Sequence, residues 1–204
     1  MSSRRHRPFV IRRRDQIAAL ESAVRQEIVD TIQAAGPRSA AEIATLMGRP
    51  ADALYYHLRR LTRVGILVQR VPRRAGGRDE AIYDLVGHPL VLDYPLPGAD
   101  PHPLPRLVRS MLRTAEKDFR AAVTSDQARP DGEFRNLWAG RRHAWLGPRD
   151  LDRVNTLIDR LVEIMTRART PGSGQLCTLT LVMAPRPARS GRRAPARSAG
   201  RNAR

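Results

Sequence analysis

From Ile17 onward, apolar residues recur every three or four positions. They are Ile17, Leu20, Val24, Ile28 and Ile32. This spacing is typical of a helix with one buried face, and it predicts a single helix of about four to five turns that ends at Gly36 and Pro37. Residues 1–14 show no such pattern, and we expect a disordered arm there.

Two shorter helices are predicted after Gly36. Ser39 and Glu42 fit the S-x-x-E pattern of a capping box, which predicts a helix over residues 40–47. The third helix is expected to begin near Pro50, because proline suits a first helical turn. Its apolar face consists of Leu54, Leu58, Leu61 and Val64, and Gly65 ends it.

A hairpin is predicted directly after the third helix. Residues 66–71 and residues 81–86 are apolar and rich in β-branched side chains, as two paired strands would be. The flexible turn between them, residues 72–79, is basic and contains Arg73, Arg74, Gly76, Gly77 and Arg78. Three helices followed by a basic-tipped hairpin form a winged helix-turn-helix.

The second half of the chain predicts a smaller α+β unit. Its elements follow in the order helix over residues 104–123, strand over 139–146, helix from Pro148 with a broad apolar face, and strand over 176–183. The predicted organisation is thus a disordered basic arm (1–14), a winged-helix domain (15–87), a Pro-rich linker (88–105), a C-terminal dimerisation or effector region (106–184) and a disordered Arg-rich tail (185–204).

The net charge of +17 comes mainly from the two ends of the chain. Residues 1–14 hold six arginines and residues 185–204 hold seven, with no acidic residue in either segment. Lys117 is the one lysine among 37 basic residues, a preference for arginine that we attribute to a GC-rich genome. The ends are either solvated tails or arms that hold phosphates by charge, and the sequence is compatible with both.

A second concentration of charge lies on the third helix and the hairpin. Eight arginines occur from Arg49 to Arg78, against Asp52 and the adjacent Asp79. A recognition helix needs an apolar inner face and a polar outer face that meets bases and phosphates in the major groove. We therefore predict contacts to double-stranded DNA from Ser39, Arg49, Ala51, Asp52, Tyr55, Tyr56, His57, Arg59, Arg60, Arg63, Arg73, Arg74 and Arg78, with the last three on the backbone or in the minor groove.

These same residues resemble a known family. The run SAAEIATLMGRPADALYYHLRRLTRVGILVQRV and the later GGRDEAIYDL are similar to the winged helix of ArsR-like bacterial transcription regulators, over roughly residues 16–85. The stretches AWLGPRDLDRVNTLIDRL and LTLVMAP resemble the C-terminal region of a longer branch of these regulators, which implies a dimer. The resemblance implies regulation of transcription without enzymatic activity, and it does not identify an operator.

Metal sensing, which occurs in that family, is not predicted for this chain. Cys177 is the only cysteine, and none lies near the second helix. The histidines His6, His57, His88, His102 and His143 show no ligand spacing. We expect no metal and no cofactor, and a reducing cytoplasm suits a chain with one thiol and no apolar run of membrane-spanning length. We expect Cys177 to be buried as a small apolar residue.

Several side chains have two interpretations. His57 is either a half-buried packing histidine or a contact to phosphate or base, and Tyr83 is expected to pack in the hairpin. Trp138 and Trp145 are expected to be packing groups, although Trp145 could also line an apolar pocket for an unknown small-molecule effector. We expect a homodimer interface formed by Leu20, Val24, Leu151, Val154, Leu157, Ile158, Leu161 and Ile164.

Two alternatives to a sequence-specific regulator remain from the sequence. The basic tails could drive non-specific binding to nucleic acid or chromatin. The arginines of the winged helix could instead meet an acidic protein partner.

Overall fold

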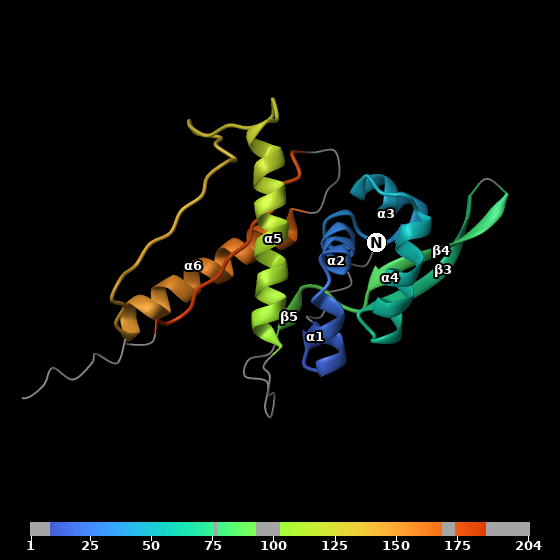
Figure 1. Cartoon of the computed structure of the whole chain (residues 1–204), viewed down its shortest axis with the longest axis horizontal. Coiled ribbons are helices and arrows are strands. Elements are labelled where there is room, and N and C mark those ends of the chain that lie inside the picture. Colours follow the sequence, from blue (N-terminus) through green and yellow to red (C-terminus); the bar gives the residue numbers. More distant parts are fainter. Residues whose placement is uncertain (1–8, 76, 93–102, 169–173, 187–204) are drawn as a thin grey trace, which may run out of the picture.

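The computed structural model describes residues 9–75, 77–92, 103–168 and 174–186. Along the chain the elements are β1 (Phe9–Ile11), α1 (Arg14–Leu20), α2 (Ala23–Ala35), β2 (Arg38–Ser39), α3 (Ala40–Met47), α4 (Asp52–Arg63), β3 (Leu67–Ala75), β4 (Arg78–Leu85), β5 (Leu90–Leu92), α5 (Leu104–Val123) and α6 (Pro148–Arg167). The predicted winged helix-turn-helix is confirmed: α3 and α4 lie beside α2, and the β3–β4 hairpin projects from one end of the molecule (Figure 1).

One hydrophobic core holds the helices of the first half together. Ile17, Ile28, Ile32, Ile43 and the leucines Leu54, Leu58 and Leu61 are all fully buried in it. Apolar side chains at helical spacing bury one face of each helix in this way, which is the main source of its stability. Leu107 brings α5 onto the same core, where α5 packs against α1 and α2.

The prediction of one continuous first helix is wrong. The chain forms two helices, α1 and α2, in this segment. Ser22 occupies the N-cap position of α2 with an extended backbone, a place that serine favours. The buried Gln26 side chain donates to the Leu20 carbonyl oxygen at 2.6 Å, and Arg25 donates to the carbonyl of Ala19. These side chains satisfy carbonyl groups that a continuous helix would have bonded internally.

The expected disordered arm is also wrong over residues 9–14. Phe9–Ile11 forms β1, which pairs in parallel with β5, and the Phe9 N–H donates to the Pro89 carbonyl oxygen at 3.0 Å. Ile11 is buried in the core, which explains why this apolar triplet is ordered although it is too short to show periodicity. β5 in turn lies inside the segment predicted as a linker; residues 1–8 and 93–102 lie outside the described part of the chain.

The wing is a longer hairpin than predicted. β3 and β4 continue through most of the expected turn, so that Ala75 pairs with Arg78. Gly77 has a φ of 79°, a left-handed conformation that glycine adopts without strain. β2 pairs with β4 on its other edge, through Ser39 and Ile82, and joins the wing to the start of α3.

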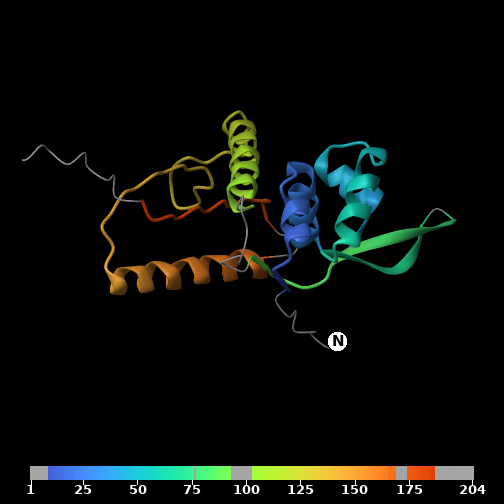
Figure 2. The same ribbon diagram turned by 60° about the horizontal axis from the view of Figure 1, so that its bottom comes forward.

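The C-terminal half contains the two predicted helices but neither predicted strand. Residues 139–146 and 176–183 form no ladder with any described strand, and an isolated strand has no partner for its backbone groups. α6 buries none of its residues and runs outward from the rest of the chain, with residues 174–186 above it in the second view (Figure 2). No helix in the described part of the chain is long and apolar enough to cross a membrane.

Candidate nucleic-acid interface

One face of α4 is buried in the core, and the opposite face is exposed to solvent. Leu54, Leu58 and Leu61 are fully buried, so the helix cannot rotate without emptying the core. Gly65, with a φ of 71°, turns the chain from the end of α4 into β3. Tyr56 lies on the other side of the helix and exposes 70 % of its surface. The outward face of α4 is therefore fixed in direction by its buried face.

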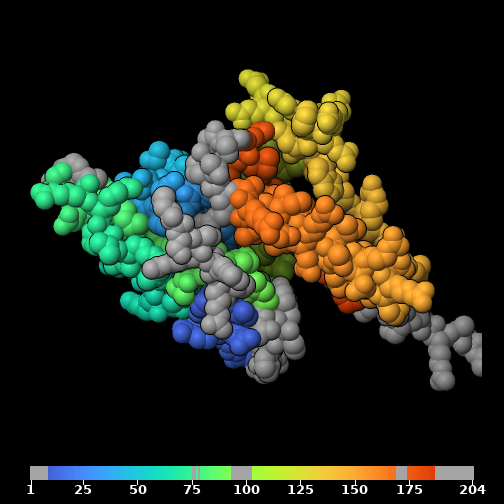
Figure 3. All heavy atoms as spheres, turned by 180° about the vertical axis from the view of Figure 1, so that it is seen from behind, coloured from blue at the N-terminus to red at the C-terminus, as the bar shows by residue number. Residues whose placement is uncertain are grey.

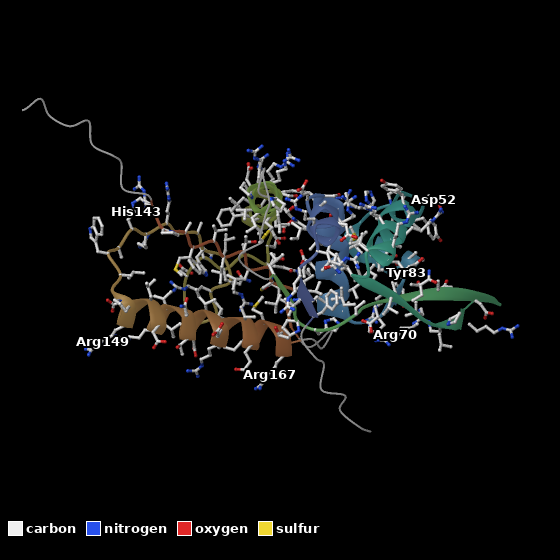
Figure 4. The ribbon with its side chains drawn as sticks, turned by 90° about the horizontal axis from the view of Figure 1, so that it is seen from below. Asp52, Arg70, Tyr83, His143, Arg149 and Arg167 are labelled. Carbon is white, nitrogen blue, oxygen red and sulfur yellow. The ribbon has the colours of Figure 1, made fainter. Side chains whose placement is uncertain are left out.

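The structure brings five predicted contact residues together on this outward face. Asp52, Tyr55, Tyr56, Arg59 and Arg63 are all exposed, and Asp52 stands at the edge of the molecule in Figure 4. Positions four apart on a helix lie one above the other. Tyr56, Arg59 and Arg63 thus present phenol and guanidinium groups side by side. These groups donate hydrogen bonds, which base edges and phosphate oxygens can accept.

Arg25 adds to this face, although the sequence pattern gave no signal for it. Arg25 belongs to α2, where it looked like one polar position in an amphipathic helix. Burial first, and then the nearby positive charge of Arg60 of α4, lower the pKa of Arg25, and its guanidinium donates to the Ala18 carbonyl oxygen at 3.5 Å. Arg60 itself is half-buried. The positive charge of the recognition helix is therefore extended by a residue of a neighbouring helix.

His57 has the properties of a packing residue. Burial first, and then the positive charges of Arg25 and Arg49, lower its pKa. The ring is therefore neutral at physiological pH and packs edge-on to Tyr56, with ring centroids 5.4 Å apart. Its Nδ1 atom is buried without a hydrogen-bond partner among the described residues.

Three other predicted contacts have structural partners. Arg49 forms an ion pair with Glu27 of α2, with Nη2 and Oε2 2.8 Å apart. The side chain of Ser39 is buried and accepts a hydrogen bond from the Glu42 N–H at the start of α3. Ala51 is half-buried at the N-cap of α4, against the core. These residues hold the helix-turn-helix in shape.

The wing is attached to the helices by charged side chains. Arg73 Nη2 lies 2.9 Å from Glu42 Oε1 of α3 and 3.9 Å from Glu80 Oε2 of the opposite strand. Arg74 is exposed and forms no ion pair with any described residue. Arg78 belongs to β4, and its side chain lies outside what the structure describes. Among the wing arginines whose side chains are described, Arg74 is therefore the one that no ion pair engages.

A second ion pair fixes the base of the wing. Arg70 Nη2 lies 2.8 Å from Oδ2 of Asp84, whose other oxygen accepts from the Leu85 N–H at 2.8 Å and lies 3.5 Å from His88 Nε2. Asp84 is buried, so its charge needs these partners. Tyr83 packs into the core as predicted, on the opposite face of the hairpin from Arg70 (Figure 4).

Several other predictions are wrong or untested. Cys177, Trp138 and Trp145 were expected to be buried or packed, and all three are exposed because no described element covers them. Of the predicted dimer residues, Leu20 is buried in the core and Val24 packs against it, whereas those of α6 remain exposed or half-buried. Within the described residues, no three His, Cys, Asp or Glu side chains lie close enough together to hold a metal ion.

Residues 20–70 match a protein-family model described as a helix-turn-helix domain, whereas no curated protein matches the sequence. Similar solved structures include a possible transcriptional regulatory protein of Mycobacterium bovis, fragment 1–100 (21 % identity, 51 % of this chain and 92 % of that one, TM-score 0.28).

Two further solved structures are similar. One is the homodimeric winged helix-turn-helix DNA-binding domain Mb0332 of M. bovis, a possible ArsR-family transcriptional regulator (20 %, 55 % and 88 %, TM-score 0.28). The other is disulfide-formed AbfR (12 %, 72 % and 81 %, TM-score 0.30). Residues 20–70, with α3 and α4 at their centre, thus match a helix-turn-helix domain, and the β3–β4 hairpin that follows gives it a wing.

Proposed function

We propose that this protein is a sequence-specific DNA-binding transcription regulator. α4 would enter the major groove, and the wing would lie on the adjacent backbone or in the minor groove. The observation that carries the proposal is the outward face of α4, where Tyr56, Arg59 and Arg63 are exposed on a helix whose opposite face is fully buried.

Each part of this surface would have its own task. Arg59 and Arg63 would bind guanine edges in a bidentate way or hold phosphates, and Tyr55 and Tyr56 would reach phosphate oxygens through their hydroxyl groups. Arg74 would contact the backbone from the wing, whereas Arg73, tied to Glu42, would hold the wing in place. Ser39, Arg49 and His57 would act through the shape of the domain.

The regulator would work as a homodimer on a palindromic operator. Two copies of α4 would read half-sites about one helical turn, roughly 34 Å, apart. Twofold symmetry in the protein is what makes a palindrome the expected operator. A small-molecule effector would act on such a dimer by changing the spacing of the two α4 helices.

Selection of DNA from a random pool by the purified protein, at near-physiological salt, tests the proposal. We expect an enriched palindrome. The control protein is a variant with Arg59 and Arg63 replaced by alanine, and it should enrich no sequence. Salt-sensitive binding of all sequences, equal in both proteins, would overturn the proposal in favour of a general nucleic-acid binder.

A trimmed chain separates the basic tails from α4. The deletion should remove residues 1–8 and 187–204 and keep Phe9–Ile11, because Ile11 belongs to the core. Operator preference is expected to persist in the trimmed protein while its affinity for random DNA falls. Loss of preference together with the tails would show that the tails, and not α4, select the DNA.

A further inference from the structure

α5 carries a row of basic side chains along one side, which we call the α5 row. Its members are Arg106, Arg109, Arg113, Lys117 and Arg120. At 3.6 residues per turn these positions fall within roughly 80° of the helix circumference, and they span about 21 Å along its axis. All five are exposed, because α5 packs on α1 and α2 through another side, which includes the buried Leu107 and Ser110.

The two acidic residues of α5 leave most of this charge unbalanced. Glu116 forms an ion pair with Arg120, one turn later in the helix. Asp118 lies toward α2, where burial first and then the charge of Glu27 raise its pKa. The other four members of the α5 row form no ion pair with any described residue. Their positive charge is therefore not neutralised within the described chain.

The row begins where positive charge opposes helix formation. The N-terminal turn of a helix carries a partial positive charge, so acidic residues stabilise it and cations destabilise it. The first turn of α5 contains no acidic residue, and Arg106 lies within it. Residues that break such a local rule are typical of functional sites, which favours an anionic partner for the α5 row over simple solvation.

The α5 row lies on the same side of the molecule as the outward face of α4. In Figure 4 the outer side chains of α5 end in nitrogen atoms and point to the same side as Asp52, the first residue of α4. Arg149 of α6 points to the opposite side in this view. Figure 3 shows the molecule from behind, where α6 and the loop before it lie in front of α5. One side of the molecule therefore presents both α4 and the α5 row.

The two helices are close enough to contact one duplex. α2 lies between α4 and α5 and packs against both (Figure 1). The axes of packed helices are about 8–10 Å apart, so those of α4 and α5 are at most about 20 Å apart. With a rise of about 3.4 Å per base pair, this distance equals roughly six base pairs. α5 lies on the side of α4 away from the wing, so a duplex bound by α4 can meet the wing on one side and the α5 row on the other.

We propose that the α5 row binds the phosphate backbone of the duplex that α4 reads, on the side of α4 away from the wing. Guanidinium and ammonium groups hold phosphates by charge, so this contact adds affinity for DNA of any sequence. The inference rests on the proposed function for the identity of the polyanion. A basic helix with an apolar side also suits an anionic membrane, but the position of the row beside the outward face of α4 favours a duplex.

The salt dependence of DNA binding by the full chain tests this contact. The test variant combines Arg106→Gln, Arg109→Gln and Arg113→Gln, which removes three cations that form no described ion pair. Each phosphate contact contributes about 0.9 to the slope of log affinity against log salt, so the slope should fall by about 2.7 per chain. Affinity at near-physiological salt should fall by about tenfold or more, and by the same factor on the enriched DNA and on a random duplex of equal length.

Two control variants separate this contact from other effects. The corresponding triple lysine variant keeps the three charges and should keep the native slope, because lysine also holds phosphate. Arg149→Gln, Arg153→Gln and Arg160→Gln together remove the same charge from exposed positions of α6, and the slope should again remain native.

The outcomes distinguish this inference from the proposed function. A native slope in the glutamine variant overturns the α5 contact, even if the native protein enriches a palindrome. A lowered slope in the lysine variant also overturns it, because the charge is kept there. If the glutamine variant keeps the native slope on DNA but loses binding to vesicles of anionic phospholipid, the α5 row binds a membrane instead. A lowered slope in the glutamine variant alone, without an enriched sequence for the native protein, supports the contact and overturns sequence-specific regulation.

Discussion

Arg73 of the wing and Glu42 of α3 form an ion pair across the domain, with Nη2 and Oε1 2.9 Å apart. The Ser39 N–H donates to the other oxygen of Glu42 at 2.8 Å, so that one carboxylate caps α3 and holds the wing. Partial burial opposes the charged form of Glu42, but the Ser39 N–H and Arg73 outweigh it and lower the pKa of this carboxyl. The direction in which the wing projects therefore depends on Glu42 in the first turn of α3.

Replacement of Glu42 by glutamine should loosen the wing without unfolding α3. Glutamine keeps the capping box, because its side-chain oxygen can still accept from Ser39, but it removes the charge that holds Arg73. An exposed ion pair contributes about 0.2–1 kcal/mol, so we expect faster hydrogen exchange in β3 and little change in Tm. Glu80→Gln, which removes the longer 3.9 Å contact, is the control and should change exchange less. Equal exchange in both variants and in the native protein would contradict this role of Glu42.

Replacement of Arg59 by alanine distinguishes base reading from charge. Loss of a base contact should cost about 1–3 kcal/mol of binding free energy on the operator and much less on random DNA. Titration of both DNAs by fluorescence anisotropy measures the difference. Arg135→Ala, which removes an exposed arginine of the loop between α5 and α6, is the control for charge. Equal losses on the two DNAs would instead make Arg59 a phosphate contact.

Elements with strong local signals were predictable to the residue. The capping box at Ser39 and the left-handed Gly48 bound α3, which spans residues 40–47 as predicted. α5 likewise spans residues 104–123, because a continuous apolar stripe follows the prolines at its start. The inner and outer faces of α4 were also predictable, since helical periodicity alone separates Leu58 from Arg59.

Elements that depend on distant contacts were not predictable. β1 and β5 lie about eighty residues apart in sequence and pair in parallel, so neither carries a local signal. The break between α1 and α2 keeps the apolar spacing in phase, so the hydrogen bonds from Gln26 to the Leu20 carbonyl and from Arg25 to the Ala19 carbonyl could not be foreseen from that spacing. Arg25 could not be assigned to the α4 surface from sequence, because that required knowing how α2 and α4 cross.

The prediction of two C-terminal strands is wrong for a different reason. Residues 176–183 have the apolar, β-branched composition of a strand, but a strand forms only against a neighbour, and the described chain supplies none. Leu176, Val182 and Met183 are accordingly exposed.

Replacement of Ser39 by alanine should lower stability and leave DNA selectivity unchanged. The buried hydroxyl caps α3, and loss of such a cap costs about 0.5–2 kcal/mol. Urea unfolding measures this loss, and Ser39→Asp, which keeps a capping oxygen, should recover part of it. A selective loss of operator binding at full stability would instead show that the hydroxyl contacts DNA.

Asp30 makes stability depend on pH. Its carboxylate lies between α2 and α5, where burial first and then the charges of Asp118 and Glu27 raise its pKa to about 6. Because this value exceeds the ordinary 3.8, the folded state holds the proton more tightly than the unfolded state. The contribution to stability is therefore fully present below the ordinary pKa and is lost as the pH rises through the raised one. Asp30 also remains accessible to water, so solvent screening keeps the effect modest.

Asp30→Asn is accordingly expected to raise the Tm at about pH 7.5, where the native carboxylate is charged beside two others. The difference between the two proteins should disappear near pH 4, because there the native side chain is protonated in the folded state. Thermal unfolding across this range measures both values. Asp131→Asn removes a negative charge from the exposed loop between α5 and α6 and should leave the Tm unchanged throughout. If Asp30→Asn lowers the Tm at neutral pH, the charged Asp30 stabilises the α2–α5 contact, and a cation must lie close to it in the folded protein.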